Sequence, residues 1–345
     1  MRITKESLLR IARETVSQRI YSRPDMVAVY LTGSLLKDEP LLGNTTDIDL
    51  VFVHPFEPSI RREIVPLTAE IHLDIKYNPR SEYEHPRLLR LHPWLGPEMY
   101  DPMRLHDGQH FFDFVQAGVR DKYYEPVNAY GRAQRNFYHA RQIWSDLQME
   151  QNDSPQSMLK YLKSVNHAAN AIAVIKDSPL GERRFLTLFP ALAEAAGNPA
   201  LTAHLYRLMG AEQVDKSSLE ARLPAWEKDF QQAGKAPSCD VRLHPARRMY
   251  YRQGFEVMLG GEKPLSILWP LLHTWSLAAD CLPEDEHGEW TNLCHQLGLL
   301  EKGLEIRLKN LDLFLDEVEK ILENMAVSNG LNDSGNEKSH EYGYI

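Results

Sequence analysis

Cysteine is scarce in this sequence, and so are the long apolar runs that membrane proteins need. The 345-residue chain has three cysteines, Cys239, Cys281 and Cys294, and none of them has the CxxC spacing of a zinc site. An odd number of widely spaced cysteines predicts reduced thiols rather than a disulfide framework. No stretch approaches about 18 consecutive apolar residues, and the N-terminus lacks the apolar core of a signal peptide. We therefore expect a cytoplasmic protein without a membrane partner.

The sequence also lacks an excess of basic residues. It has 39 Lys and Arg against 48 Asp and Glu, which gives a formal net charge of −9. Proteins that bind long nucleic acids through the phosphates are usually basic, so this balance disfavours a nucleic-acid partner. Hydrophobic residues make up 43 % of the chain, which excludes general disorder and suffices for buried cores. At this length two domains are expected, and the oligomeric state stays open.

Secondary-structure patterns divide the chain near residue 105. Before this point β-rich runs mix with helical segments, and after it only helical periodicity remains. We therefore predict an α+β fold in which a small domain with a mixed sheet, residues 1–105, precedes an all-α helical bundle, residues 106–325. Residues 326–345 are polar and rich in Asn, Ser and Gly, and they are predicted to form a disordered tail.

The expected strands lie close together in the first hundred residues. They are 26–32, 48–54 and 71–77, with a helical turn at 59–67 and a short extended piece at 98–101. A first helix is expected over 4–20, and Asp107 has the position of a helix N-cap. The other expected helices are 127–147, 155–176, 183–195, 200–209, 217–233, 264–280, 289–298 and 301–325.

The segment from residue 26 to residue 77 contains the residues of a phosphate and metal site. Gly33 and Ser34 end the first strand, where glycine permits a tight turn and the backbone N–H groups and a hydroxyl can hold phosphate oxygens. Asp47 and Asp49 begin the second strand, and the period of two places both carboxylates on one face. Asp74 belongs to the polar residues that alternate with apolar ones in the third strand. Clustered carboxylates repel one another, and a hard cation such as Mg²⁺ removes this cost.

This combination resembles the signature of the DNA polymerase beta superfamily of nucleotidyltransferases. That signature is an apolar residue with Gly and Gly or Ser, a spacer, an Asp-apolar-Asp/Glu strand, and a third carboxylate on another strand. The resemblance implies a nucleotidyltransferase domain in residues 1–105, with Asp47, Asp49 and Asp74 as catalytic residues and as ligands of two Mg²⁺ ions, Mn²⁺ being the alternative. It also implies that Gly33 and Ser34 bind the nucleotide phosphates.

A polar stripe in the helical half contains a weaker candidate. Lys160, Lys163, His167 and Asn170 are spaced by three or four residues within the expected helix 155–176. In the superfamily a helical domain often presents basic groups to the triphosphate, which makes Lys163 a candidate nucleotide-binding residue. The alternative is that the stripe is the solvated face of an amphipathic helix.

Two further groups of residues carry open alternatives. The basic residues in the segment 242–252 lie beside Tyr250 and Tyr251, and they could contact phosphate or form salt bridges with acidic residues of the bundle. Glu70 and His72 share the strand face of Asp74, where they could support proton transfer, or His72 could pair with a neighbouring carboxylate.

The predicted reaction is transfer of a nucleoside monophosphate onto a hydroxyl group, with release of pyrophosphate. The favoured donor is ATP, and the favoured acceptor is a small molecule or a protein. One alternative is an RNA- or tRNA-tailing nucleotidyltransferase, which requires a continuous basic groove. Another is a non-catalytic, antitoxin-like binding partner, although short members of that kind usually lack a long helical half. The sequence does not identify the acceptor.

Overall fold

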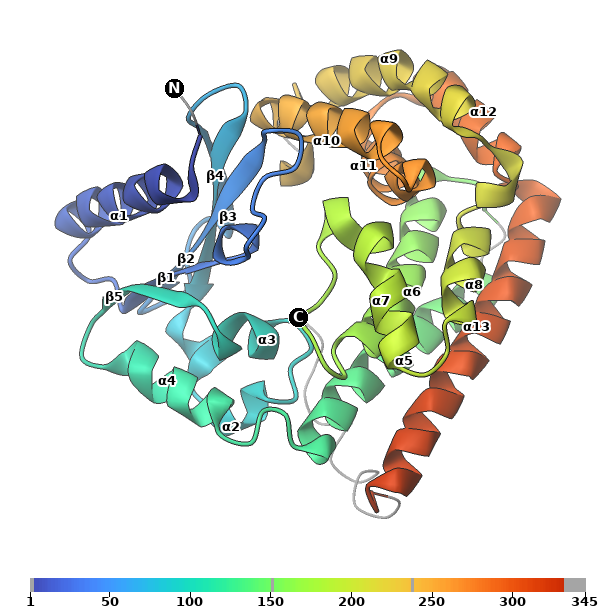
Figure 1. Ribbon diagram of the computed structural model, residues 1–345. Helices are drawn as coiled ribbons and strands as arrows, with labels where there is room; N and C mark the ends of the chain where they lie inside the picture. Colours follow the sequence, from blue (N-terminus) through green and yellow to red (C-terminus); the bar gives the residue numbers. More distant parts are fainter. Residues whose placement is uncertain (1–2, 150–151, 237–238, 332–345) are drawn as a thin grey trace.

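The computed structural model describes residues 3–149, 152–236 and 239–331 (Figure 1). Within these residues the protein is mixed α+β, with a five-stranded mixed sheet in the N-terminal part and helices over the rest of the chain. The predicted α+β class is confirmed at this level. No helix of the described ranges is both long and apolar enough to cross a membrane.

The sheet has the strand order β3-β4-β2-β1-β5. Its strands are β1 (Ala28–Thr32), β2 (Thr46–His54), β3 (Arg62–Pro66), β4 (Ile71–Pro79) and β5 (Met103–Asp107). The central strands β2 and β4 are parallel, and the other neighbours are antiparallel. The parallel register pairs Asp47 with His72 and Asp49 with Asp74, so polar side chains of the two strands lie side by side on one face.

Two local predictions in this half are wrong. Residues 59–67 contain strand β3 instead of a helical turn. The hydrogen bonds to β4 stabilise this strand, and the pattern of a five-residue segment does not reveal such pairing. Residues 98–101 fall on the end of helix α3 (Leu95–Tyr100), and the extended segment comes slightly later, as β5. β5 pairs with β1 at the edge of the sheet.

Helices cover both faces of the sheet. They are α1 (Lys5–Ser22), α2 (Pro86–Leu89), α3 (Leu95–Tyr100) and α4 (Phe111–Arg120). Thr4 begins α1 with a capping box, and its buried residues Leu8, Ala12 and Val16 pack on one face of the sheet. On the other face, α2, α3 and α4 pack in a second cluster that extends to Tyr123. α4 therefore packs with the sheet although it lies after residue 105.

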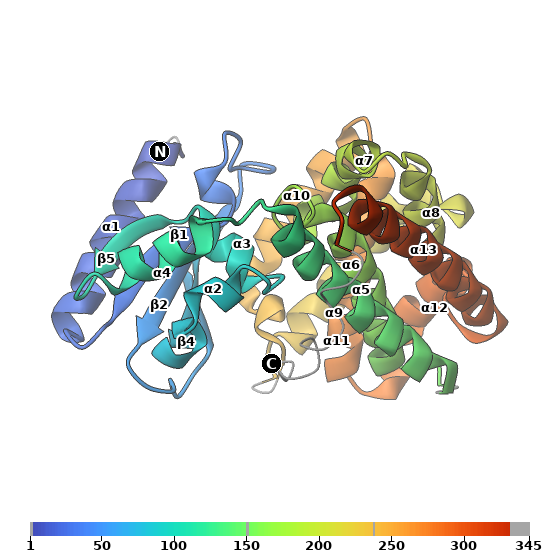
Figure 2. The same cartoon turned by 90° about the horizontal axis from the view of Figure 1, so that it is seen from below.

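The remaining helices form a bundle beside the sheet (Figures 1 and 2). They are α5 (Pro126–Met149), α6 (Pro155–Ala173), α7 (Phe185–Ala195), α8 (Ala200–Leu208), α9 (Lys216–Ala233), α10 (Arg248–Gly260), α11 (Leu268–Cys281), α12 (Gly288–Gln296) and α13 (Glu301–Ser328). Most of their buried apolar side chains belong to one hydrophobic cluster, which includes residues from Ala133 to Leu322. α13 packs along α5 and α8 on the outside of the bundle.

Some boundaries in the bundle differ from the prediction. α10 was not expected, but it buries Tyr251, Phe255 and Leu259 at helical spacing. α7 and α11 each begin after a turn of 3-10 helix, later than residues 183 and 264. α13 continues to Ser328, so the expected tail is helical at its start, and residues 332–345 lie outside the described part of the chain.

Cys239 and Cys281 form a disulfide, with their Cα atoms 6.0 Å apart. The prediction of three reduced thiols is therefore wrong for this pair. The two residues are 42 positions apart in the sequence, and only the packing of the end of α11 against the segment before α10 brings them together. Cys294 is free and buried, and burial raises the pKa of its thiol.

Candidate metal and nucleotide site

Three carboxylates meet on the sheet face that also carries α2, α3 and α4. Asp47 and Asp49 alternate along β2, and Asp74 lies opposite Asp49 on β4. One carboxylate oxygen from each residue lies within 4.8 Å of the others. Asp47 and Asp74 are buried. The structure thus brings together the three carboxylates that the sequence singles out.

The chemistry of this triad fits a hard divalent cation. Its donors are all carboxylate oxygens, which Mg²⁺ and Mn²⁺ accept as ligands. Burial, and then the charges of Asp47 and Asp74, raise the pKa of Asp49 well above its usual value. The negative charge of Asp49 is therefore costly in this structure, and a bound cation would offset that cost. The residues present could therefore hold such an ion.

Gly33 turns the chain from β1 into the 3-10 helix η1 (Ser34–Leu36), directly beside Asp49. Its φ is 79°, in the left-handed region that favours glycine. A Cβ atom at this position would lie 1.8 Å from Oδ2 of Asp49. The Ser34 hydroxyl lies 3.3 Å from Oγ1 of Thr46, the residue before Asp47. Both predicted phosphate-binding residues therefore lie next to the triad.

Two arginines that the sequence did not assign to the triad contact it. Arg62 on β3 donates from Nε to Oδ1 of Asp74 (2.7 Å) and from Nη2 to Oδ2 (2.5 Å). Arg247 belongs to the bundle and ends the 3-10 helix η6 (Pro245–Arg247). Its Nη2 lies 3.0 Å from Oδ2 of Asp74 and 3.3 Å from Oδ2 of Asp47. Burial alone would raise the pKa of Asp74, but the two arginines lower it to about 2.

His72 lies on β4 opposite Asp47 and is fully buried. Neither of its ring nitrogens has a hydrogen-bond partner among the described residues. Its ring meets Tyr250 of α10 edge-on, with centroids 5.1 Å apart. Burial lowers the pKa of His72 to about 4, so the ring is neutral near pH 7. Glu70 instead accepts a hydrogen bond from Thr68 at the start of the strand.

The bundle also holds the loop that precedes β2. Nη1 of Arg183 donates to Oγ1 of Thr45 (2.8 Å) and to the carbonyl of Tyr250 (2.9 Å), and its guanidinium lies 3.3 Å from the Tyr250 ring centre. Arg184 donates to the carbonyl of Glu39 at 2.5 Å. Because this loop connects the glycine turn to the two aspartates of β2, the position of the bundle and the shape of the site are coupled.

A network of charged and polar side chains around Glu182 connects η3 with α10 and α11 near Arg247. Glu182, in the 3-10 helix η3 (Glu182–Arg184), accepts hydrogen bonds from the Tyr251 hydroxyl (2.9 Å) and from Nδ1 of His273 (2.5 Å). Nε2 of His273 lies 3.1 Å from Nη1 of Arg242. Burial would raise the pKa of Glu182, but His273 and the nearby arginines lower it to about 2.

Replacing Glu182 with Gln is therefore expected to destabilise the protein by about 2 kcal/mol near pH 7. The folded-state pKa lies below the ordinary value, so this stabilisation is present above about pH 4.5 and is lost as the pH falls toward about 2. Urea unfolding of both proteins over this range measures the difference, and Glu305→Gln on the exposed face of α13 is the control. A difference that stays constant with pH would contradict the assigned charge.

The predicted nucleotide-binding residue Lys163 lies on the exposed side of α6. The polar stripe does not form one surface, because Lys160 and Lys163 are exposed whereas His167 and Asn170 are buried. The His167 ring contacts Trp94 edge-on, at 5.7 Å between centroids. The bundle side chain that pairs with the triad is instead Arg247, at the end of η6. The role of Lys163 in nucleotide binding stays a prediction.

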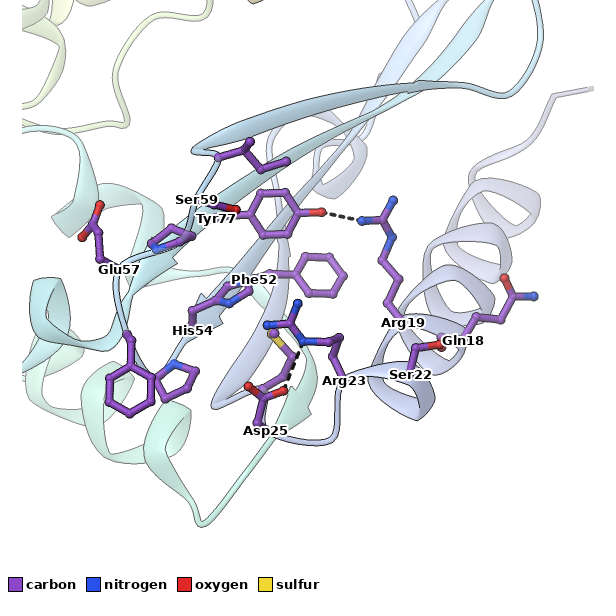
Figure 3. A pocket seen from close by; sticks show the side chains of 15 residues that line it. Gln18, Arg19, Ser22, Arg23, Asp25, Phe52, His54, Glu57, Ser59 and Tyr77 are labelled. Atoms are coloured by element: carbon purple, nitrogen blue, oxygen red, sulfur yellow. Dashed lines mark hydrogen bonds and ion pairs between the residues drawn. The ribbon is translucent and has the colours of Figure 1, made fainter.

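A hollow of about 650 Å³ lies between α1 and the loop after β2 (Figure 3). Its lining includes Phe52, His54 and Tyr77 of the sheet and Arg19 and Arg23 of the α1 region. These strand residues face α1, whereas the triad faces away from it. The seven strand steps from the first aspartate of β2 to His54 span about 23 Å. This hollow is therefore separate from the triad.

Comparison with known proteins adds no assignment. No protein-family model matches the sequence, and no curated protein is significantly similar to it. The interpretation of the site therefore depends on its residues and their geometry.

Proposed function

We propose that this protein is a metal-dependent nucleotidyltransferase that moves a nucleoside monophosphate onto a hydroxyl group of a small molecule or a protein. ATP is the proposed donor. The observation that carries the proposal is the convergence of Asp47, Asp49 and Asp74 from two adjacent strands. They lie beside a turn at which a side chain larger than that of Gly33 would collide with the Asp49 carboxylate. Acidic residues that merely lie on a surface are not expected to be buried, as Asp47 and Asp74 are, or to lie against a glycine turn, as Asp49 does.

The reaction assigns a separate task to each part of the site. Asp47 and Asp49 would hold two Mg²⁺ ions and Asp74 one of them, and bound Mg²⁺ neutralises triphosphate charge and activates the attacking oxygen. The turn at Gly33 and Ser34 offers N–H and hydroxyl donors to the phosphate oxygens. The acceptor oxygen bonds to the α-phosphorus, and the bond from this phosphorus to the leaving pyrophosphate oxygen breaks. The hydroxyl proton would pass by way of Asp74 to solvent, because a carboxylate with a pKa of about 2 does not retain it.

A transfer assay tests this proposal. The protein is incubated with Mg²⁺ and each α-labelled nucleoside triphosphate, with small-molecule, protein and RNA acceptors in separate reactions. We expect label from ATP on a small molecule or a protein, an equal amount of pyrophosphate, and no transfer by Asp47→Ala. Asp113→Ala is the matched control, because Asp113 is exposed on α4 and pairs with Arg104 instead of the triad.

The other outcomes separate the alternatives. Label that appears on RNA in preference to small acceptors would make the protein a tailing enzyme and contradict the proposed acceptor. Absence of both transfer and metal-dependent nucleotide binding, together with a stoichiometric copurifying protein, would contradict the enzymatic proposal and favour the antitoxin-like alternative.

A further inference from the structure

Arg247 pairs with two carboxylates of the triad that a bound cation would share. Its Nη2 is within hydrogen-bond distance of Oδ2 of Asp74 (3.0 Å) and of Oδ2 of Asp47 (3.3 Å). A Mg²⁺ ion bound to both oxygens must sit about 2.1 Å from each. The guanidinium nitrogen lies beside both oxygens, and its positive charge would repel a cation bound to them. Arg247 and such an ion therefore compete for the same two carboxylates.

Arg247 is held at the site mainly by its ion pairs with Asp47 and Asp74. Its side chain is only 5 % exposed, and Nε and Nη1 have no hydrogen-bond partner among the described residues. The rings of Tyr250 and Tyr251 lie 5.4 and 5.9 Å from the guanidinium carbon. A buried guanidinium with two unused donors is costly, and the two carboxylates offset that cost. The Arg247 side chain thus neutralises part of the charge of the triad while its Nε and Nη1 donors stay unused.

The position of Arg247 in the chain connects this contact to the bundle. It ends η6 and immediately precedes α10, whose residue Tyr250 packs on His72 of the sheet. Leaving the carboxylates requires the guanidinium to turn away or this edge of the bundle to shift. Nε and Nη1 have no acceptor in their present position, and either movement would allow them to reach one. Phosphate oxygens are acceptors that match the geometry and charge of a guanidinium well.

We propose that Arg247 and the divalent cation exchange at the triad. Without cation and nucleotide, Arg247 neutralises Asp47 and Asp74 and closes the site. When a divalent cation binds these carboxylates, Arg247 leaves them and its free donors turn to the triphosphate. The inference rests on the proposed metal site and concerns its regulation: the cation binds more tightly when a nucleotide offers Arg247 another partner.

Titration with Mn²⁺ tests the exchange without any catalytic assay. Free Mn²⁺ is measured by electron paramagnetic resonance with the full-length protein and no nucleotide. Arg247→Gln removes the competing charge and is expected to bind Mn²⁺ about tenfold more tightly than the wild type. Arg248→Gln is the matched control, because its guanidinium pairs with Glu227 of α9 instead of the triad, and it should leave the affinity unchanged.

Thermal melting covers the case in which the variant is unstable. In a chelator Arg247→Gln should melt below the wild type, and saturating Mn²⁺ should raise its melting temperature by more than that of the wild type. Mn²⁺ affinity of Arg247→Gln equal to or weaker than that of the wild type would overturn the exchange. The expected difference in a protein that transfers no nucleotide would support the exchange and reject the catalytic proposal. Adding Asp47→Asn to Arg247→Gln should remove the gain in affinity, and a gain that persists would place the ion elsewhere and overturn the exchange.

Discussion

Replacing Asp49 with Asn is expected to reduce nucleotide transfer about a thousandfold or more and, at the same time, to make the protein more heat-stable in a chelator. Activity falls because an amide is a neutral and weaker ligand for a hard cation. Stability rises because burial and the charges of Asp47 and Asp74 raise the pKa of Asp49 well above its usual value. The amide removes that repulsion while keeping the shape of the side chain. Opposite signs for activity and stability identify a residue kept for function at a cost to the fold.

Calorimetry in a chelator and initial transfer rates at saturating Mg²⁺ measure the two effects. Asp113→Asn serves as the control, because Asp113 is exposed and its carboxylate pairs with Arg104, so the same change should leave the transfer rate unaltered and give no gain in stability. If Asp49→Asn melted below the wild type in the chelator, its carboxylate would be compensated in the fold. If it kept more than about a tenth of the rate, Asp49 would not take part in the chemistry.

The triad could be predicted because the information for it is local. The period of two along one strand places Asp47 and Asp49 on the same face, and the alternation of residues 70–77 gives Asp74 a polar face of its own. What the sequence could not supply was the register. The parallel pairing of β2 with β4 sets Asp74 opposite Asp49, and this register depends on the whole sheet.

The cations around the triad could not be predicted, since their contacts are not local. Arg62 lies in the segment interpreted as a helical turn, and only its strand pairing directs it toward Asp74. Arg247 was noticed within a basic run, but its partner Asp47 is 200 positions away in the sequence. Such contacts depend on how the bundle packs on the sheet, which residue patterns within each half do not contain.

Gly33→Ala is expected to reduce nucleotide transfer about a hundredfold or more, because small displacements of reacting groups have effects of this size. The new Cβ would lie 1.8 Å from Oδ2 of Asp49, so the carboxylate or the turn has to move. Alanine also has to adopt a φ of 79° with a ψ of −158°, a conformation almost confined to glycine that costs about 1–3 kcal/mol. The first effect acts on the site and the second on the backbone, and activity alone cannot separate them.

Gly197→Ala separates the two effects. Gly197 has a φ of 81°, close to that of Gly33, but a Cβ there would meet nothing within 4 Å. Both variants should lose stability to backbone strain, measured by urea unfolding, and Gly33→Ala is expected to lose more because its ψ of −158° is almost confined to glycine. Only Gly33→Ala should lose transfer activity and Mn²⁺ affinity. Equal activity of the two variants would mean that the turn can withdraw from Asp49 without consequence. A selective loss would show that the close approach of the Gly33 backbone to this carboxylate sets the geometry for the reaction.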